Sequence, residues 1–263
     1  MENRTPGRFR LFLRRYAVGV ALVLSFGLVR LPFERELARE RVADAVNSVT
    51  LDLKVREKVT QNEFIAALGG FRSLVADVLW VEALTDWERV EYGKMNLKFS
   101  TVTTLVPHNV MFWDMAGWHM AYNASVAVME DRNEPKIAVR KKRQREYFLL
   151  GKDYLERGVA NNPHSAILNH QLGEILQRKL EDHLAASAAY DRAAACPDAL
   201  SYEKRMAAYE LAKVPGHERE AWQRLRALYD MGPQERLPTL EKELKELEEK
   251  LGLPPEQRVY KAP

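Results

Sequence analysis

One short segment holds the densest group of side chains that are capable of chemistry. Asp114, His119 and Asn123 place a carboxylate, an imidazole and an amide close together, and Trp118 and Tyr122 lie among them. Residues four apart on a helix share a face, so Asp114, Trp118 and Tyr122 are expected to line up. Aromatic rings beside hydrogen-bonding groups are typical of protein-binding hot spots, whereas an acid and an imidazole could act in catalysis. The same tryptophans could also fill a core.

The motifs of common enzyme and metal sites are missing from the sequence. The histidines form neither HExxH nor another tight metal-ligand pair, and no glycine-rich phosphate loop, nucleophile elbow or CxxCH sequence occurs. They are His108, His119, His164, His170, His183 and His217. The single cysteine, Cys196, cannot form an internal disulfide. The sequence therefore predicts no metal, no cofactor and no catalysis.

Three segments share one spacing, in which a small or apolar residue is followed by another four positions later and by proline eight positions beyond. These segments are Met95/Phe99/Pro107, Gly151/Leu155/Pro163 and Ala185/Ala189/Pro197. Pro163 and Pro197 are 34 residues apart, which is the period of a tetratricopeptide repeat. The pattern predicts an all-α fold, a tetratricopeptide-like α-solenoid of about three to four helical hairpins. An irregular helical bundle is the alternative.

An insertion interrupts the second of these units. Trp113 and Pro163 are 50 residues apart, where an uninterrupted repeat allows about 28. The insertion is expected at about 124–146, between the two helices of the unit. It contains the basic residues Arg140, Lys141, Lys142, Arg143 and Arg145. They are expected either to form the solvated face of a helix or to contact an anionic surface such as lipid headgroups.

The repeat pattern also predicts a partner-binding groove. Its expected lining residues are Asp114, Trp118, Tyr122, His170, Glu174, Gln177, Arg178 and Lys204. They carry both signs of charge, so we do not expect the groove to clamp a terminal carboxylate. The expected occupants are other envelope proteins or peptides.

A further polar pair, Arg72 and Asp77, lies in the segment 64–84, which is otherwise nearly all apolar. Glu82 adds a third charge, and three charges would be costly inside a bilayer. We therefore expect an inner helix rather than a second transmembrane segment. An Arg72–Asp77 contact would stabilise the first repeat, and binding of a ligand in the groove is the alternative role.

The amino-terminal sequence has the features of a membrane anchor. Residues 1–15 hold five arginines against one acid, and 16–33 are apolar apart from Arg30. Because positive charge stays on the cytoplasmic side, we expect a single-pass anchor at 16–33 with the remainder outside the cytoplasm. A cleaved signal peptide is the alternative. Residues 34–63 are charge-rich and are expected to form a juxtamembrane linker or helix.

The carboxy-terminal half completes the expected domain organisation. The repeat domain is predicted at 64–232, a capping helix at 233–252 and a flexible tail at 253–263. Leucines at helical spacing over 238–251 indicate an amphipathic helix. Residues 1–15 carry five arginines and one acid, so the formal charge of +3 leaves about −1 for the remainder, and no nucleic-acid-binding face is expected.

The chain resembles a group of bacterial membrane-anchored tetratricopeptide-like proteins. The resemblance runs from about residue 64 to 195, through GGFR at 69–72, ADVLW at 76–80, PH at 107–108, GWHMAYN at 117–123 and LGEI at 172–175. It implies the fold and the anchoring but no activity. We therefore predict a membrane-anchored scaffold for other envelope proteins, with self-association as a further possibility. An envelope enzyme or small-ligand-binding protein that uses Asp114, His119, Asn123, Arg72 and Asp77 is the alternative.

Overall fold

The computed structural model describes residues 71–259 of this chain. These residues form helices, turns and loops without a strand, which confirms the all-α class. None of the helices in this range is both long and apolar enough to cross a bilayer. The expectations for residues 1–70 and 260–263, the membrane anchor and the start of the repeat domain included, lie outside the described residues.

The chain divides into two compact units. The first contains the described residues 71–82 and 104–106, and the second contains 83–103 and 107–259. Within the first unit, α3 (Arg72–Glu88) begins, and Ala76 is buried. Asp77 is exposed and forms no ion pair among the described residues, so the expected Arg72–Asp77 contact does not form. Residues five apart on a helix are separated by roughly 140° around its axis, which explains the separation.

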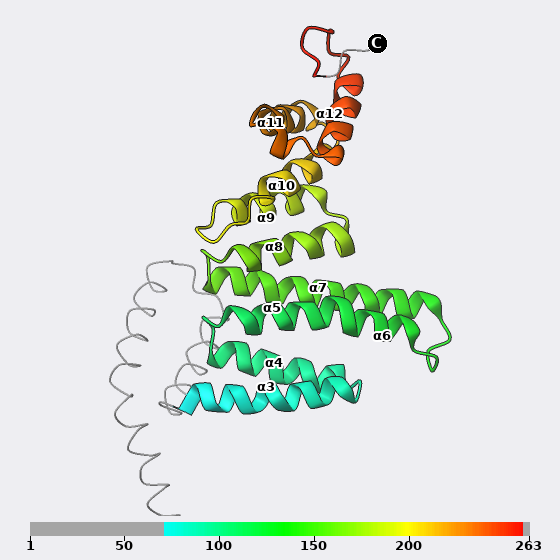
Figure 1. Cartoon of the computed structure of the whole chain (residues 1–263). Coiled ribbons are helices and arrows are strands. Elements are labelled where there is room, and N and C mark those ends of the chain that lie inside the picture. Colours follow the sequence, from blue (N-terminus) through cyan, green and yellow to red (C-terminus); the bar gives the residue numbers. More distant parts are fainter. Residues whose placement is uncertain (1–70, 260–263) are drawn as a thin grey trace, which may run out of the picture. The chain divides into compact units, whose positions relative to one another are not determined.

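The second unit is a succession of helices in which chain neighbours pack together (Figure 1). It takes in most of α4 (Tyr92–Leu105) and then runs through α5 (Val110–Trp118), η2 (His119–Ala124), α6 (Ser125–Glu130), α7 (Ile137–Asn161), α8 (Ala166–Ile175), η3 (Leu176–Leu180), α9 (His183–Ala194), α10 (Glu203–Ala212), α11 (Glu218–Asp230), η4 (Pro233–Glu235) and α12 (Pro238–Lys250). The helices η2 and η3 are π-helical turns and η4 is a 3₁₀ turn.

Polar side chains begin several of these helices. The carboxamide oxygen of Asn109 accepts a hydrogen bond from the Met111 amide at the start of α5. Ser165 accepts from the Leu168 amide at the start of α8, and Asp182 accepts from the Ala185 amide at the start of α9. These residues satisfy amides that would otherwise lack partners in the first helical turn.

The segment expected as an insertion forms the adjoining ends of two helices. Helix α6 continues to Glu130 and α7 begins at Ile137, so only a short turn separates them. The α6–α7 end projects beyond the neighbouring α8 and α9 (Figure 1). Arg140 holds the two helices together here, because its guanidinium donates to the Met129 carbonyl at 2.8 Å.

Helices α5, η2 and α7 pack with almost no space between their backbones. A Cβ added to Gly151 would lie 2.7 Å from the Gly117 carbonyl oxygen and 2.7 Å from the Ala121 Cβ. A Cβ added to Gly117 would lie 2.7 Å from the Leu155 Cγ. We call Gly117, Ala121, Gly151 and Leu155 the glycine seam. Only glycine at position 151 permits this approach of the two backbones.

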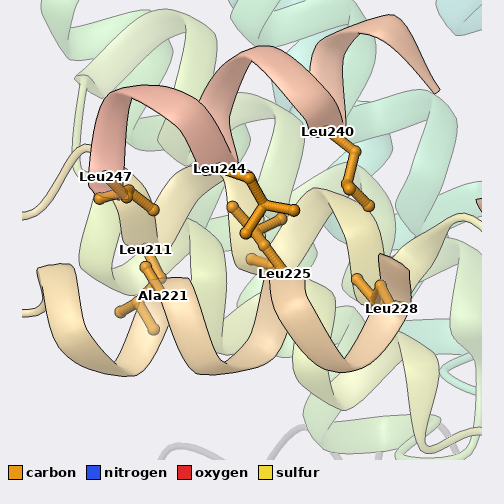
Figure 2. Close-up of a cluster of buried hydrophobic side chains, with 8 residues drawn as sticks. Leu211, Ala221, Leu225, Leu228, Leu240, Leu244 and Leu247 are labelled. Atoms are coloured by element: carbon orange, nitrogen blue, oxygen red, sulfur yellow. The ribbon is translucent and has the colours of Figure 1, made fainter. Parts of the chain in front are cut away.

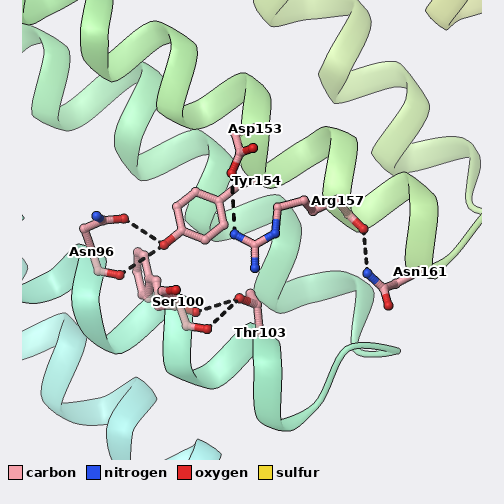
Figure 3. A network of polar contacts seen from close by, with 8 residues as sticks. Asn96, Ser100, Thr103, Asp153, Tyr154, Arg157 and Asn161 are labelled. Atoms are coloured by element: carbon pink, nitrogen blue, oxygen red, sulfur yellow. Dashed lines mark hydrogen bonds and ion pairs between the residues drawn. The ribbon is translucent and has the colours of Figure 1, made fainter. Parts of the chain in front are cut away.

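A polar network lies beside the glycine seam (Figure 3). The buried Tyr154 of α7 donates from its hydroxyl toward Asn96 of α4, 2.7 Å from the side-chain oxygen and 3.0 Å from the carbonyl oxygen. On α7, the Arg157 guanidinium donates to the Asp153 carboxylate. The side-chain amide of Asn161 donates to the backbone carbonyl of Arg157. The Tyr154 hydroxyl therefore links two helices that are far apart in the sequence.

The carboxy-terminal part of the second unit has a different core (Figure 2). Its buried residues come from α10, α11 and α12 and are aliphatic; we call them the C-terminal layer: Ala208, Leu211, Ala221, Leu225, Leu228, Leu240, Leu244 and Leu247. Three of the four leucines whose spacing predicts an amphipathic helix over 238–251 are buried here.

Candidate functional site

Both π-helical turns coincide with residues predicted for the groove. Tyr122 lies in η2, and Gln177 and Arg178 lie in η3. A π-helical turn holds an additional residue within a helix and is frequent at functional sites. The two turns belong to consecutive helical pairs, and each continues the first helix of its pair. In both pairs, predicted groove residues therefore lie in a turn that is wider than regular α-helix.

Aromatic rings and a lysine form the centre of this site. The Trp118 and Tyr122 rings are stacked, with centroids 6.3 Å apart. Lys179 of η3 places its ammonium 4.1 Å from the Tyr122 ring centroid, a cation–π contact across the two turns. Burial, followed by the repulsion of Arg178, lowers the pKa of Lys179. Trp118 is 40% exposed, so much of this large ring faces solvent.

Charged side chains flank the aromatic centre. Arg178 and Glu174 form an ion pair at 3.0 Å. Asp114 is partly buried and has neither an ion pair nor a hydrogen bond among the described residues. Burial raises the pKa of Asp114, and the influence of His170 lowers it in part. An unpaired carboxylate beside an exposed tryptophan can receive a cation or a hydrogen-bond donor from a partner.

His119 lies beneath the exposed tryptophan. Its ring is 2% exposed and lies 5.1 Å from the Trp118 ring, 5.3 Å from the Trp87 ring and 5.6 Å from the Phe99 ring. The Asn123 amide donates to its Nδ1 at 3.0 Å, which leaves the proton of the neutral imidazole on Nε2. Burial lowers the pKa of His119. The imidazole is therefore a neutral packing group enclosed by aromatic rings.

His170 connects the site to the next helical pair. Its Nδ1 donates to the buried Glu203 carboxylate of α10 at 3.0 Å, and its ring contacts the Tyr190 and Tyr202 rings. Tyr190 donates in turn to the Gln177 side-chain oxygen at 2.8 Å. The contacts of His170 and Gln177 thus lie within the helical stack, while Trp118 and Asp114 retain capacity for a partner.

Lys204 contributes to a different surface. It lines a cleft formed by α9, α10 and α11, together with Asp191 and Arg224, which are themselves paired at 2.6 Å. The apolar part of this cleft comes from Leu228, Met231 and three alanines. Of the eight residues predicted for the groove, Lys204 thus lies apart from the others, on this cleft.

The basic residues of the predicted anionic-surface contact lie on the first turns of α7. Arg140 is engaged with the Met129 carbonyl, as described above. The other members, Lys141, Lys142, Arg143 and Arg145, are exposed.

Several contributors to the site were not predicted from the sequence. Lys179, Tyr190 and Glu203 are the most important of them. The spacing offers one signal, because His170 and Glu203 are 33 residues apart, close to one repeat period, as are Arg224 and Asp191. Pairing polar residues one period apart would have found both contacts.

Comparisons with known proteins leave the site to be interpreted from its geometry. No family model matches the chain, and neither the curated proteins nor the solved structures include a significant match. Within residues 71–259, no group of three or more His, Cys, Asp and Glu side chains is arranged to hold a metal ion.

Proposed function

We propose that this protein is a membrane-anchored, tetratricopeptide-like scaffold that binds other proteins at the exoplasmic face of a bacterial cytoplasmic membrane. The anchor and the topology rest on the arginine-rich, apolar amino-terminal sequence. The repeat assignment rests on the proline period of 34 residues and on the consecutive packing of α5 through α11. Small residues at the helix contacts, as in the glycine seam, agree with that assignment.

The observation that carries the proposal is the exposed Trp118 beside the unpaired Asp114. A ring of this size that is 40% exposed keeps apolar surface in contact with water, and a partner that covers this surface gains the free energy of its burial. The stacked Tyr122 and the Arg178–Glu174 ion pair hold the surroundings in place before a partner arrives. Preorganisation of this kind lowers the entropic cost of binding.

The enzyme alternative receives less support from the same geometry. His119, the imidazole that would act as a general base, is 2% exposed and enclosed by three rings. Asn123 is already bonded to it. A catalytic base must reach the proton that it abstracts, and this imidazole faces rings and an amide.

The test is copurification of partners from crosslinked membranes with the full-length protein and with a Trp118→Ala variant. We expect a partner to be recovered with the parent protein and lost, or reduced by roughly tenfold, with Trp118→Ala. Asp114→Asn should weaken recovery to a smaller degree. Tyr122 is left intact, because its ring packs on Lys179 and its hydroxyl is enclosed.

Leu184→Ala is the matched control for this experiment. Leu184 lies on α9 and is 48% exposed, so its truncation removes exposed apolar surface elsewhere. Recovery should be unchanged with this variant, and the melting temperatures of all variants should agree. Equal recovery with Trp118→Ala and with the parent protein would reject the proposed binding surface.

The proposed topology has its own test. Protease added outside intact, cytoplasm-out membrane vesicles should leave the repeat domain uncut, because the membrane would separate them. Degradation of the repeat domain before detergent is added would overturn the topology without affecting the binding result.

A further inference from the structure

The charge of the described chain is unevenly distributed. The α6–α7 hairpin end, residues 130–146, carries seven basic and four acidic residues. The remaining described residues carry 20 basic and 25 acidic residues, so their net charge has the opposite sign. This basic end is also the part that projects beyond α8 and α9 (Figure 1).

None of the seven cations at this end has an acidic partner among the described residues, and six of the seven are exposed. Lys141, Lys142, Arg143 and Arg145 are exposed and form no ion pair among the described residues. Elsewhere in the second unit, exposed basic residues commonly have one, for example Lys94 with Glu91 at 2.9 Å and Lys250 with Glu218 at 2.6 Å. The cations of the hairpin end are therefore available to an external anion.

Helix stability does not account for this arrangement. The first turn of α7 contains no acidic residue, although acidic side chains would stabilise a helix there. Lys141 and Arg145 are four apart, a spacing at which like charges repel each other on a helix. The local helix would be more stable with a different charge pattern, which points to a role outside the helix.

Exposed apolar side chains accompany the cations. Ile137, the first residue of α7, is 49% exposed, and Leu149 is 46% exposed. A lipid interface binds both kinds of side chain, because cations contact the phosphate headgroups while apolar residues enter the boundary of the acyl chains. A nucleic-acid backbone would bind only the cations.

We propose that the α6–α7 hairpin end binds the surface of anionic phospholipid membranes through Lys141, Lys142, Arg143 and Arg145, with Ile137 entering the interface. Arg140 is excluded from the contact set because it holds α6 to α7. The contact is independent of the binding surface around Trp118 and would fix the orientation of the domain against a bilayer.

The test uses the full chain with a polarity-sensitive fluorophore on the hairpin end. Asn133→Cys provides the labelling position in the turn between α6 and α7, and Cys196→Ser removes the native thiol while keeping an acceptor and donor at that position. The probes are vesicles of phosphatidylcholine with or without phosphatidylglycerol. We expect the fluorescence change to require phosphatidylglycerol and to diminish with added salt.

The decisive variant is Lys141→Gln/Lys142→Gln/Arg143→Gln/Arg145→Gln, which should lower the apparent affinity by roughly tenfold or more. Its matched control removes four other exposed cations by Arg89→Gln/Lys94→Gln/Lys242→Gln/Lys245→Gln and should retain the response. Both carry the same change in net charge, and thermal melting verifies that both fold. A label placed instead at Glu256→Cys, on the carboxy-terminal segment, should show no fluorescence change when vesicles are added.

Three results would overturn the proposal. An equal response to neutral vesicles would remove the role of anionic lipid, and a response that survives in the decisive variant would remove the role of these cations. A response to duplex DNA without one to phosphatidylglycerol vesicles would assign the hairpin end to nucleic acid instead. Because the label reports on the hairpin end itself, insertion of the amino-terminal segment into the vesicles leaves the readout valid.

Discussion

The C-terminal layer fills the space between its helices with leucine side chains, whereas the glycine seam has no space to fill. In the C-terminal layer, Leu225, Leu240 and Leu244 are fully buried and separate the helix backbones. In the glycine seam, Gly151 brings α7 against the Gly117 carbonyl and Ala121. The two regions should therefore respond in opposite ways to a change of side-chain volume.

This difference also separates two kinds of specificity. Aliphatic layers tolerate exchanges that conserve volume, because many leucine-rich arrangements fill the same space. A close backbone approach tolerates very little, because a carbonyl oxygen cannot move aside as a side chain can. The glycine seam lies in the same helices as Trp118, so the precise part of the fold is the part that positions the candidate site.

The largest expected effect comes from removing volume from the C-terminal layer. Leu244→Ala should lower the free energy of unfolding by about 2–5 kcal/mol, because the cavity adds to the lost burial. Denaturant unfolding followed by circular dichroism measures it. Leu237→Ala is the control, because Leu237 is 39% exposed and its truncation should cost well under about 1 kcal/mol. Equal losses in both variants would mean that the layer is not the closely packed core described here.

Adding side-chain volume at the glycine seam should lower the free energy of unfolding. Gly151→Ala should cost about 1–3 kcal/mol or more, because its Cβ would meet a carbonyl oxygen and the Ala121 Cβ at 2.7 Å. Gly93→Ala is the control, since Gly93 lies within α4 and a Cβ there has no neighbour within 4 Å. That variant should gain about 0.5–1 kcal/mol from helix propensity. A Gly151→Ala protein as stable as the parent would contradict the close approach.

Removing a single hydroxyl beside the seam should have a smaller effect. Tyr154→Phe should cost about 1 kcal/mol through the lost hydrogen bond to Asn96. Burial raises the pKa of Tyr154, so above pH 10 the unfolded chain ionises first and stability falls as the pH rises. The free energy of unfolding should therefore decline less steeply above pH 10 for Tyr154→Phe than for the parent. An equally steep decline in both proteins would show that the hydroxyl is exposed.

The smallest effect concerns His119. Burial lowers its pKa in the folded state, so the unfolded chain binds the proton first as the pH falls below about 6.5. Stability should decline through that window, with a contribution of at most about 1.4 kcal/mol per pH unit from one such group. His119→Phe should make the decline between pH 7 and 5 less steep, while His164→Phe, at an exposed position, should leave it unchanged. An unchanged slope in His119→Phe would place the imidazole in contact with water.

The helical class and the places where helices end follow from sequence spacing. Prolines at 107, 163 and 197 each come shortly after a helix, and the leucine spacing over 238–251 corresponds to α12. The same spacing cannot indicate how an additional segment is accommodated. The structure extends α6 and α7 with it, because residues 124–130 and 137–146 continue the helices on either side.

The candidate site was only partly accessible to sequence reasoning. Trp118 and Tyr122 were expected to share a face, and their rings are stacked. The predicted contact between Arg72 and Asp77 does not form, because residues five apart point in different directions around a helix. The enclosure of His119 depends on Trp87 and Phe99, which come from two other helices, so no local pattern could have indicated it.

The π-helical turn η2 marks a place where this chain could lose a residue at little cost to its geometry. A turn of this kind holds one residue more than regular α-helical winding, so deleting one residue from η2 would let regular winding replace it. The helices on either side would keep close to their present register, and the contact of Arg140 with Met129 would be retained, because both residues lie beyond the turn. A deletion within the regular helix α7 would instead rotate everything beyond it by roughly 100° about the helix axis. The consequence of one missing codon would thus depend on whether it falls in the π-helical turn or in the regular helix that packs against it.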